Sequence, residues 1–310
     1  MKIDVIIPVY RPGRELFELL DRLMKQTVPV GQIILMNTEE RFFEEAVYGT
    51  DFSVRYRNVK VHHLSKREFD HGRTRHQGVR RSEADIFVMM TQDAMPADEF
   101  LLEKLTRNLS GQVAVSYARQ LPREGSSALE KVSRQFNYPE TSRVKGLKDL
   151  GELGIKTYFC SNVCAAYRRD IYEELGGFLR RTIFNEDMIY AAKAVKAGYL
   201  ISYEAQAQVI HSHNYTCGQQ FHRTFDLGVS QADHPEIFSG VKSESEGKKL
   251  LKAAGVYFKE NGQRGKLFAF YIQCCFKYAG YLLGKNYKKL PKKMILWASD
   301  NKEYWSKNHD

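Results

Sequence analysis

Cysteine is scarce in this sequence and follows no recognisable pattern. The 310 residues contain five cysteines, which is an odd number, and they are widely dispersed: Cys160, Cys164, Cys217, Cys274 and Cys275. They lack the paired spacing of a structural zinc site and do not suggest a disulfide framework. We therefore expect free thiols and a reducing cytoplasm as the location.

A long apolar run is also missing. The start, MKIDVIIPVY, has one Lys before a short apolar run that Pro8 interrupts, so we expect a buried first strand and not a secretory signal. The most apolar window, residues 268–283, spans only 16 residues and contains Gln273 and Lys277. It is too short and too polar for an ordinary membrane-spanning helix.

Acidic residues are sparse at the C-terminal end. From residue 242 to residue 310 the chain has 15 Lys and Arg against 6 Asp and Glu, so these residues carry +9 of the total net charge of +10. A basic segment can serve either nucleic acid or an anionic membrane. No nucleic-acid-binding motif is recognisable here, and an aromatic-rich helix flanked by lysines favours the surface of a membrane. The alternative is a helix packed on the rest of the protein with a solvated basic face.

Apolar strand-like runs alternate with helical patterns through the first two thirds of the chain. Residues 2–10, 32–36, 59–64 and 85–90 are predicted strands, and helical spacing follows several of them. Residues 158–167, 200–203 and 207–211 are further predicted strands, and residues 168–175 and 188–197 are predicted helices. This alternation predicts an α/β fold with a mostly parallel sheet covered by helices on both faces, in residues 1–238, and a basic, aromatic-rich helical tail in residues 239–310.

Three groups of polar residues could carry chemistry. Asp93 follows an apolar strand, as a hard oxygen ligand for Mg²⁺ or Mn²⁺ would, or as an ordinary turn residue. Glu186 and Asp187 open a predicted helix, where a carboxylate can act as a general base or simply complement the helix dipole. His211 and His213 end a strand two residues apart, so both imidazoles would lie on one face as a possible metal pair.

The order of these groups resembles that of the family-2 glycosyltransferases. The matching phrases, in chain order, are IIPVY, IILMNTEE, GRTRHQG, MMTQDA, YRRDIYEELGGF, NEDMIYAAKAVKAGY and AQVIHSH, and they extend from about residue 2 to about residue 216. The resemblance implies a GT-A fold, which binds a nucleotide-diphospho-sugar, and single-displacement transfer of the sugar with inversion.

Carried over residue by residue, the resemblance implies a role for each matching position. Asp93 would hold the metal and the diphosphate, Asp187 beside Glu186 would be the general base, and His211 would be a metal ligand, with His213 as a second candidate. The residues implied for the nucleotide-sugar site are Pro8, Tyr10, Asn37, Glu39, Asp70, Arg75, Gln92 and Asp93. The sequence departs from the family pattern at Asn37, where an Asp is usual, and at Thr91-Gln92-Asp93, which has only one acid.

These departures resemble the bacterial rhamnosyltransferase branch of the family, in the phrases EFDHGRTRH, TQDA and HSHNYT. That branch implies dTDP-L-rhamnose as the donor, a carbohydrate or lipid-linked saccharide as the acceptor, and a role in cell-wall or capsular polysaccharide synthesis. We expect a cytoplasmic enzyme, peripheral on the inner face of the membrane. Two alternatives stay open: a UDP-sugar donor, UDP-galactose or UDP-N-acetylglucosamine, and an inactive carbohydrate-binding or scaffold protein with the same fold.

Overall fold

The computed structural model describes residues 1–240 and 244–306. The chain divides into two compact units. The first unit comprises Met1–Leu121, Tyr138–Arg181 and Glu186–His211, and the second comprises Pro122–Asn137, Thr182–Asn185 and Ser212–Asp310. The boundary predicted after residue 238, between a catalytic domain and a helical tail, lies within the second unit. The assignment of residues 239–310 as a separate tail therefore stays a prediction.

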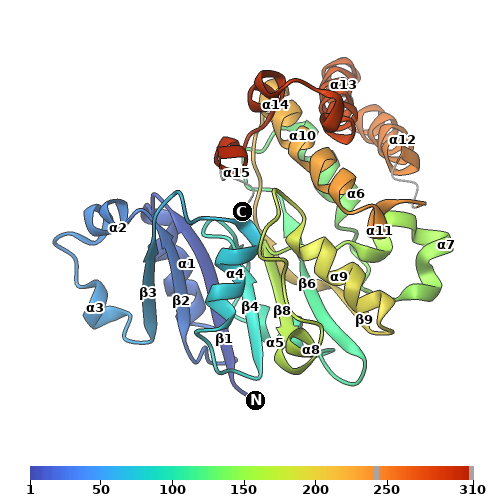
Figure 1. Cartoon of the computed structure of the whole chain (residues 1–310). Helices are drawn as coiled ribbons and strands as arrows, with labels where there is room; N and C mark the ends of the chain where they lie inside the picture. The colour runs from blue at the N-terminus through green and yellow to red at the C-terminus, as the bar shows by residue number, and fades with distance from the viewer. Residues whose placement is uncertain (241–243, 307–310) are drawn as a thin grey trace. The chain divides into compact units, whose positions relative to one another are not determined.

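A nine-stranded sheet forms the centre of the first unit. One half contains four parallel strands in the order β3 (Val59–Leu64), β2 (Ile33–Thr38), β1 (Ile3–Tyr10) and β4 (Ile86–Met90), which lie side by side in Figure 1. β2 and β4 are buried along their whole length, as expected of parallel strands covered on both faces.

The other half of the sheet is mixed. β8 (Cys164–Arg168) is antiparallel to both β4 and β6 (Val113–Leu121), and β6 is parallel to β9 (Leu200–Ile210). Two short strands, β5 (Met95–Pro96) and β7 (Arg143–Lys145), pair with β9. The α/β class and the GT-A type of sheet are confirmed.

Three of the predicted strands are wrong in their extent. The strand predicted for residues 158–167 begins only at Cys164, because residues 154–158 form a 3₁₀ helix and residues 159–163 are irregular. The two strands predicted at 200–203 and 207–211 are one strand, β9, whose register against β6 shifts after Ala118. This shift is a bulge, which interrupts the alternation of side chains without ending the strand.

Helices cover both faces of the sheet. Alternate residues of β1, from Ile3 to Val9, pack with the apolar side of α1 (Arg14–Met24). Ile6 points to the opposite face, where it lies against Gly78 of α4 (His71–Val79). The remaining helices of this unit are α2 (Glu40–Val47), α3 (Phe52–Arg55), α5 (Leu101–Thr106), α7 (Leu150–Leu153), α8 (Arg169–Glu174) and α9 (Glu186–Lys196).

The second unit is helical. α10 (Cys217–Asp233) packs against α13 (Gly265–Lys285), and α12 (Glu244–Glu260) contacts both α13 and α6 (Ala128–Asn137). It also contains α11 (Pro235–Phe238), α14 (Lys292–Ala298) and α15 (Lys302–Ser306). The helix α10 was not predicted, although Thr216 and Gln219 form a capping box at its start, which is a recognisable sequence signal. All five cysteines are free thiols, as predicted.

Candidate active site

In the first unit, the residues predicted to carry chemistry lie along one edge of the sheet, the edge formed by the ends of its strands. Asp93 follows the end of β4, and residues 161–163 lead into β8, its antiparallel neighbour. The Thr91 N–H donates to the carbonyl of Val163 (3.2 Å), which ties these two segments together. His211 follows β9, and its N–H donates to Leu121 at the end of β6 (2.9 Å). The carboxyl ends of strands are where open α/β sheets bind their ligands.

Asp93 and His211 form a close pair at this edge. Nε2 of His211 lies 3.4 Å from Oδ2 of Asp93, and both side chains are largely buried. On the other side of the ring, Nδ1 donates to Oε1 of Gln120 (3.1 Å). That bond places a ring hydrogen on Nδ1, which leaves Nε2 as the nitrogen that faces Asp93 and that would bind a metal. Two ligands with bonds of about 2.1 Å to an octahedral cation are separated by about 3 Å, so the pair fits a divalent metal.

His213 belongs to the second unit, and its ring lies beside that of Tyr215, with centroids 5.0 Å apart. The neighbouring Ser212 is part of that unit too, where its hydroxyl accepts from the Arg123 N–H (3.0 Å). The two histidines of the predicted pair are therefore held by different surroundings. Gln120 orients His211, whereas His213 has an aromatic neighbour.

Glu186, the first residue of α9, is paired with Arg75 of α4. Nε of Arg75 lies 3.2 Å from Oε1 of Glu186, and both side chains are more than nine-tenths buried. Arg75 also donates to the carbonyl of His71 (3.1 Å), one turn earlier in its own helix. A buried guanidinium normally needs such a carboxylate, so the pair fixes α4 against α9.

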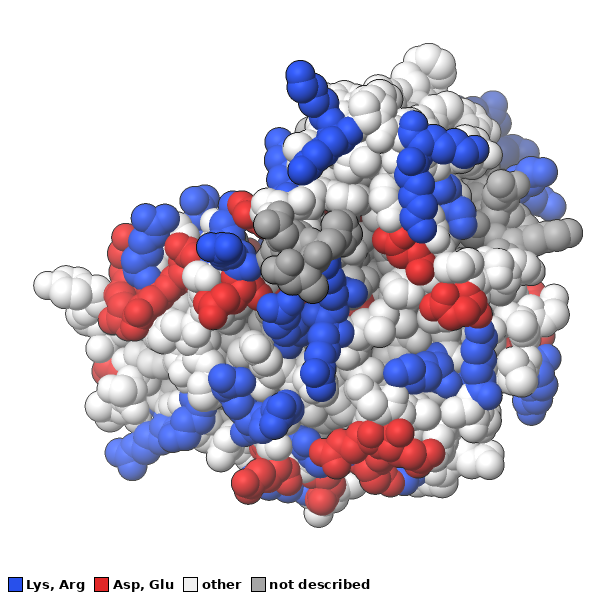
Figure 2. Space-filling model, in the orientation of Figure 1, with Lys and Arg blue, Asp and Glu red and all other residues white. Residues whose placement is uncertain are grey.

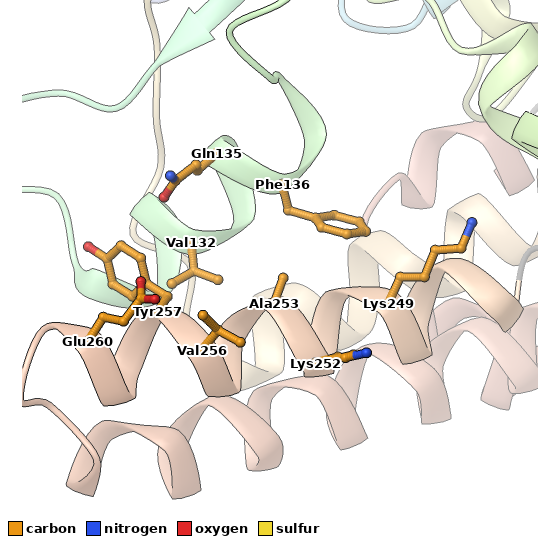
Figure 3. Close-up of a pocket in the computed structure, with 9 residues that line it drawn as sticks. All are labelled: Val132, Gln135, Phe136, Lys249, Lys252, Ala253, Val256, Tyr257 and Glu260. Atoms are coloured by element: carbon orange, nitrogen blue, oxygen red, sulfur yellow. The ribbon is translucent and has the colours of Figure 1, made fainter.

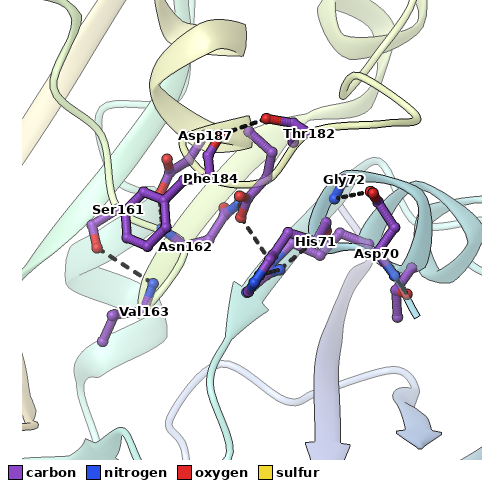
Figure 4. A network of polar contacts seen from close by, with 12 residues as sticks. Asp70, His71, Gly72, Ser161, Asn162, Val163, Thr182, Phe184 and Asp187 are labelled. Atoms are coloured by element: carbon purple, nitrogen blue, oxygen red, sulfur yellow. Dashed lines mark hydrogen bonds and ion pairs between the residues drawn. The ribbon is translucent and has the colours of Figure 1, made fainter. Parts of the chain in front are cut away.

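Asp187 is the partly exposed member of the acidic pair. Its Oδ2 accepts from the Asn162 N–H (2.9 Å), and its Oδ1 accepts from its neighbour Met188 (2.7 Å). The Asn162 side chain donates to Glu186 (3.1 Å) and accepts from the Tyr167 hydroxyl (2.7 Å). One asparagine thus contacts both carboxylates, as the close-up of Figure 4 shows for Asn162 and Asp187.

The two carboxylates differ in their affinity for protons. Burial raises the pKa of Glu186, but the charges of Arg75 and His71 outweigh burial and hold it below its ordinary value. Burial and the nearby charge of Glu186 raise the pKa of Asp187 to about 7. Neighbouring acids whose pKa values are separated in this way are typical of catalytic sites. The arrangement leaves Asp187 able to take up a proton near neutral pH.

The ends of β1 and β4 are linked by Gln92. Its Oε1 accepts from the Tyr10 N–H (2.9 Å), and its Nε2 donates to the Tyr10 carbonyl (3.0 Å). The next residue, Arg11, has a positive φ of 49°, which is uncommon for a residue other than glycine. Gln92 therefore supports a strained turn beside Asp93. Pro8 lies two residues earlier in β1 and is partly exposed.

The end of β2 shows similar features. The Asn37 side chain is fully buried and donates to Nδ1 of His63 in β3 (2.9 Å). Glu39 has a positive φ of 67°, and its carboxylate accepts from the Lys66 N–H (2.6 Å). Strained backbone at the ends of two adjacent strands is a feature of ligand sites.

Asp70 has a structural role at the start of α4. Its Oδ1 accepts from the N–H groups of Gly72 (2.9 Å) and Arg73 (3.0 Å), which makes it the N-cap of the helix. Figure 4 shows the contact with Gly72. Donor binding by Asp70 stays a prediction.

A groove in the second unit contains none of the predicted site residues. It has a volume of about 490 Å³ and lies between α6 and α12. Figure 3 shows Phe136, Val256 and Tyr257 along it, with Lys249 and Lys252 toward one end and Glu260 at the other.

Comparison with known proteins identifies one family and two close relatives. The family model described as glycosyl transferase family 2 matches residues 4–176. The O-antigen chain rhamnosyltransferase RfbN of Salmonella typhimurium (strain LT2) is 36% identical over 315 residues, which cover 99% of this chain and 96% of that protein. The O-antigen chain rhamnosyltransferase WbaN of Salmonella anatum is 36% identical over 312 residues, which cover 97% and 95%.

Solved structures share the fold at low sequence identity. The mannosyltransferase PcManGT from Pyrobaculum calidifontis, in complex with GDP-Man and Mn²⁺, is 17% identical with a TM-score of 0.55, over 99% of this chain and 88% of that one. The 1–349 fragment of S. aureus TarS is 16% identical with a TM-score of 0.52, over 93% and 92%. Both likenesses concern the fold alone.

Proposed function

Because this chain belongs to glycosyl transferase family 2 and is a glycosyltransferase, we propose that it transfers L-rhamnose from dTDP-L-rhamnose to a hydroxyl of a saccharide acceptor, with inversion. The observation that carries this proposal is the near full-length similarity to two O-antigen rhamnosyltransferases. The product would be part of a bacterial surface polysaccharide. The acceptor is a carbohydrate or a lipid-linked saccharide.

Asp187 is the general base of this proposal. The acceptor hydroxyl transfers its proton to the Asp187 carboxylate as its oxygen forms a bond to the anomeric carbon. The bond from that carbon to the diphosphate breaks, and the electron pair leaves with the diphosphate. Partial exposure and a pKa of about 7 suit Asp187 to this task. Glu186 is held by Arg75 and stays charged, so it supports Asp187 electrostatically.

Asp93 and His211 would hold a divalent cation, Mg²⁺ or Mn²⁺, with His213 as the second histidine candidate. The support comes from the 3.4 Å pair and from the bond of Gln120 that orients the imidazole, since metal-binding histidines usually have such a partner on the other ring nitrogen. When bound, the cation neutralises charge on the leaving diphosphate. Orienting the two ligands is the task of the protein itself.

The nucleotide-sugar donor would bind along the ends of β1, β2 and β4. Tyr10, Asn37, Glu39 and Gln92 surround these strand ends, and Pro8 shapes the end of β1. In our proposal Asp70 and Arg75 act on the donor through the placement of α4, since Asp70 caps the start of that helix and Arg75 joins it to Glu186.

The membrane would be approached through the second unit. Among the described residues, no helix has the length and apolar character needed to cross a bilayer. α13 nevertheless has an inverted pattern of exposure: its polar Lys277 is partly buried and Gln273 donates to the Tyr215 carbonyl (3.3 Å), while its outer side is apolar. We name this outer side the α13 face; its large exposed residues are Phe268, Tyr271, Ile272, Phe276, Tyr278 and Leu282.

The charge around the α13 face complements an anionic surface. Residues 265–299 contain seven Lys and no Asp or Glu. Figure 2 shows Lys and Arg side chains distributed over the helices of the second unit, separated by uncharged surface. Exposed aromatic residues together with lysines are typical of a peripheral membrane element. We therefore propose attachment to the cytoplasmic face of a membrane.

A donor screen tests the proposed reaction. Calorimetry with Mn²⁺ or Mg²⁺ would compare dTDP-L-rhamnose, UDP-galactose and UDP-N-acetylglucosamine, and Asp93→Ala would be the control for metal-dependent binding. We expect binding of dTDP-L-rhamnose that depends on the metal. If a UDP-sugar binds more tightly, that sugar nucleotide is the donor and dTDP-L-rhamnose is not. If none of the three sugar nucleotides binds, the inactive scaffold is favoured.

A further inference from the structure

Lys145 is a buried lysine at the end of β7 in the first unit. Only 4% of the residue is exposed. Its Nζ donates to the Lys156 carbonyl (2.6 Å), the Phe159 carbonyl (2.7 Å) and the Tyr117 hydroxyl (3.1 Å). An ammonium group has three N–H donors, so these acceptors use all of them.

Three hydrogen-bond acceptors and two aromatic rings offset part of the cost of burying the Lys145 ammonium. The rings of Tyr117 and Phe159 lie 5.0 Å and 5.7 Å from Nζ, within the range of cation–π attraction. Burial lowers the pKa of Lys145 to about 7, and Cys160 and Asp149 act against that while Lys156 and Arg143 add to it. Burying an ammonium in this way costs free energy, so a compensating role is expected.

The two carbonyls that Lys145 contacts lie on either side of the start of the segment that leads to Asn162: Lys156 is in the 3₁₀ helix before it, and Phe159 is its first residue. Residues 159–163 have no regular secondary structure between a 3₁₀ helix and β8. The contact at Phe159 is three residues before Asn162, whose N–H donates to Asp187. A segment without helix or strand bonds depends on such side-chain contacts for its conformation.

We propose that Lys145 is a positioning residue for the reaction: its ammonium group holds residues 156–162 so that the Asn162 N–H points at Oδ2 of Asp187. This rests on the proposed role of Asp187 as the base. Lys145 itself contacts no substrate in this account. It acts through the backbone of the segment and through Asn162.

The Asn162 hydrogen bond opposes the effects that raise the pKa of Asp187. Burial and Glu186 raise that pKa, whereas the N–H groups of Asn162 and Met188 and the charge of Arg75 lower it. Cys160 and Tyr167 also interact with its charge. The groups that face Asp187 thus come from α4, α9, the segment before β8 and β8 itself. Weakening the Asn162 bond would raise the pKa of Asp187 further, because the bond favours the charged form.

Lys145→Met tests the proposal, since methionine has a similar length and no N–H group. Turnover by purified full-length enzyme would be measured against pH, with Lys148→Met as a control for an exposed lysine three residues away. We expect kcat to fall by roughly tenfold or more, the KM for the donor to stay within a few fold, and the acid limb of kcat to move to higher pH. Lys145→Arg, which keeps N–H donors, should recover part of kcat, and Lys148→Met should match the wild type.

The shift of the acid limb separates positioning from simple support of the fold. A loss of kcat that is equal at every pH, or no loss at all, would overturn the proposal. If Lys145→Met does not fold, Tyr117→Phe provides a second test, because it removes one of the three acceptors. It should move the acid limb in the same direction by less, and an unmoved acid limb in this variant would also overturn the proposal.

Asp187→Asn, measured in parallel, distinguishes the positioning role of Lys145 from the proposed role of Asp187 as the base. Near-normal turnover of Asp187→Asn removes the base assignment. An inactive Asp187→Asn together with an unmoved acid limb in Lys145→Met removes only the positioning role.

Discussion

Glu186 and Asp187 are adjacent in the chain but have different tasks in the proposed reaction. Arg75 neutralises Glu186 across 3.2 Å, whereas Asp187 is bound by two backbone N–H groups and is partly exposed. We expect Asp187→Asn to keep donor affinity within a few fold and to lower turnover by roughly 10² or more, because general-base assistance typically contributes that much. Calorimetry and a steady-state assay would measure the two quantities. Turnover close to that of the wild type would contradict the assignment.

The pH dependence of turnover follows from the raised pKa of Asp187. The base must be ionised to accept the proton, and its pKa is about 7. We therefore expect kcat to rise with pH through about 7 and to level off above it. Because Glu186 and Asp187 interact, the midpoint belongs to the pair. An acid limb near pH 4, where an ordinary aspartate titrates, would show that the observed step does not depend on Asp187.

The two histidines make different contacts, and this predicts unequal effects on metal use. His211 is oriented toward Asp93 by Gln120, whereas His213 lies beside Tyr215. His211→Ala should raise the Mn²⁺ concentration for half-maximal activity more than His213→Ala does. A titration of activity with Mn²⁺ gives both values, and Asp93→Ala should resemble His211→Ala. The reverse ranking would move the ligand to His213.

Asp93, Glu186, Asp187 and His211 were singled out by their order along the chain, which resembles that of the family, because each of them alone has an ordinary structural explanation. The structure places Asp93 beside His211, and the catalytic and metal-binding roles of all four residues stay predictions. The supporting residues could not be predicted in the same way. Asn162 lies in a run of strand-like residues, and the buried Lys145 lies in a segment with weak periodicity. Their partners are distant in sequence or are backbone groups, and neither kind of contact leaves a pattern in the sequence.

At the scale of elements, the parallel strands were predictable from their apolar runs. The continuity of β9 through residues 204–206 was not, because the bulge there breaks the alternation on which the prediction depends. The largest omission was α10. Its first turn carries a capping box, but much of its apolar surface is matched by α13, almost 50 residues later. The two helices stabilise each other, so neither is fully explained by its own sequence.

The contact between α10 and α13 depends on glycine. A Cβ atom at Gly280 would collide with the carbonyl of Phe221, and one at Gly284 would collide with the carbonyl of Phe225. Backbone cannot move away as an exposed side chain can, so Gly284→Ala should lower the free energy of unfolding by about 1 to 3 kcal/mol. Thermal or urea unfolding would measure it.

Gly255 in α12 is the matched control for that prediction. A Cβ atom there would meet nothing within 4 Å, so Gly255→Ala should stabilise the protein by up to about 1 kcal/mol through helix propensity. Equal effects of the two substitutions, or a Gly284→Ala variant as stable as the wild type, would show that α10 and α13 are not packed through this contact.

At the scale of the whole molecule, net charge and exposed apolar surface are concentrated in the same part of the chain. The +9 of residues 242–310 accounts for nearly all of the excess charge, and the α13 face exposes large apolar residues, of which Phe268 is 73% exposed. A protein that carries its charge and its apolar surface together gains both electrostatic and apolar free energy at one anionic interface. A lipid-linked acceptor would then share that surface with the enzyme.

This arrangement predicts binding to anionic vesicles, which sedimentation with phosphatidylglycerol-containing and pure phosphatidylcholine vesicles would measure. Attraction of about 1 kcal/mol for each lysine near the surface should make binding fall at high salt, where the Debye length shortens.

Exchanging Lys288 and Lys289 for Glu should weaken binding much more than the same exchange at Lys25 and Lys196, which are exposed in the first unit. Phe268→Ser with Phe276→Ser should weaken it as well, whereas Tyr48→Ser, at a residue 89% exposed elsewhere, should not. If binding does not change with salt concentration but is lost when the phenylalanines are replaced, apolar insertion is the sole attraction. If the intact protein does not bind vesicles at all, the α13 face is covered by protein instead of lipid.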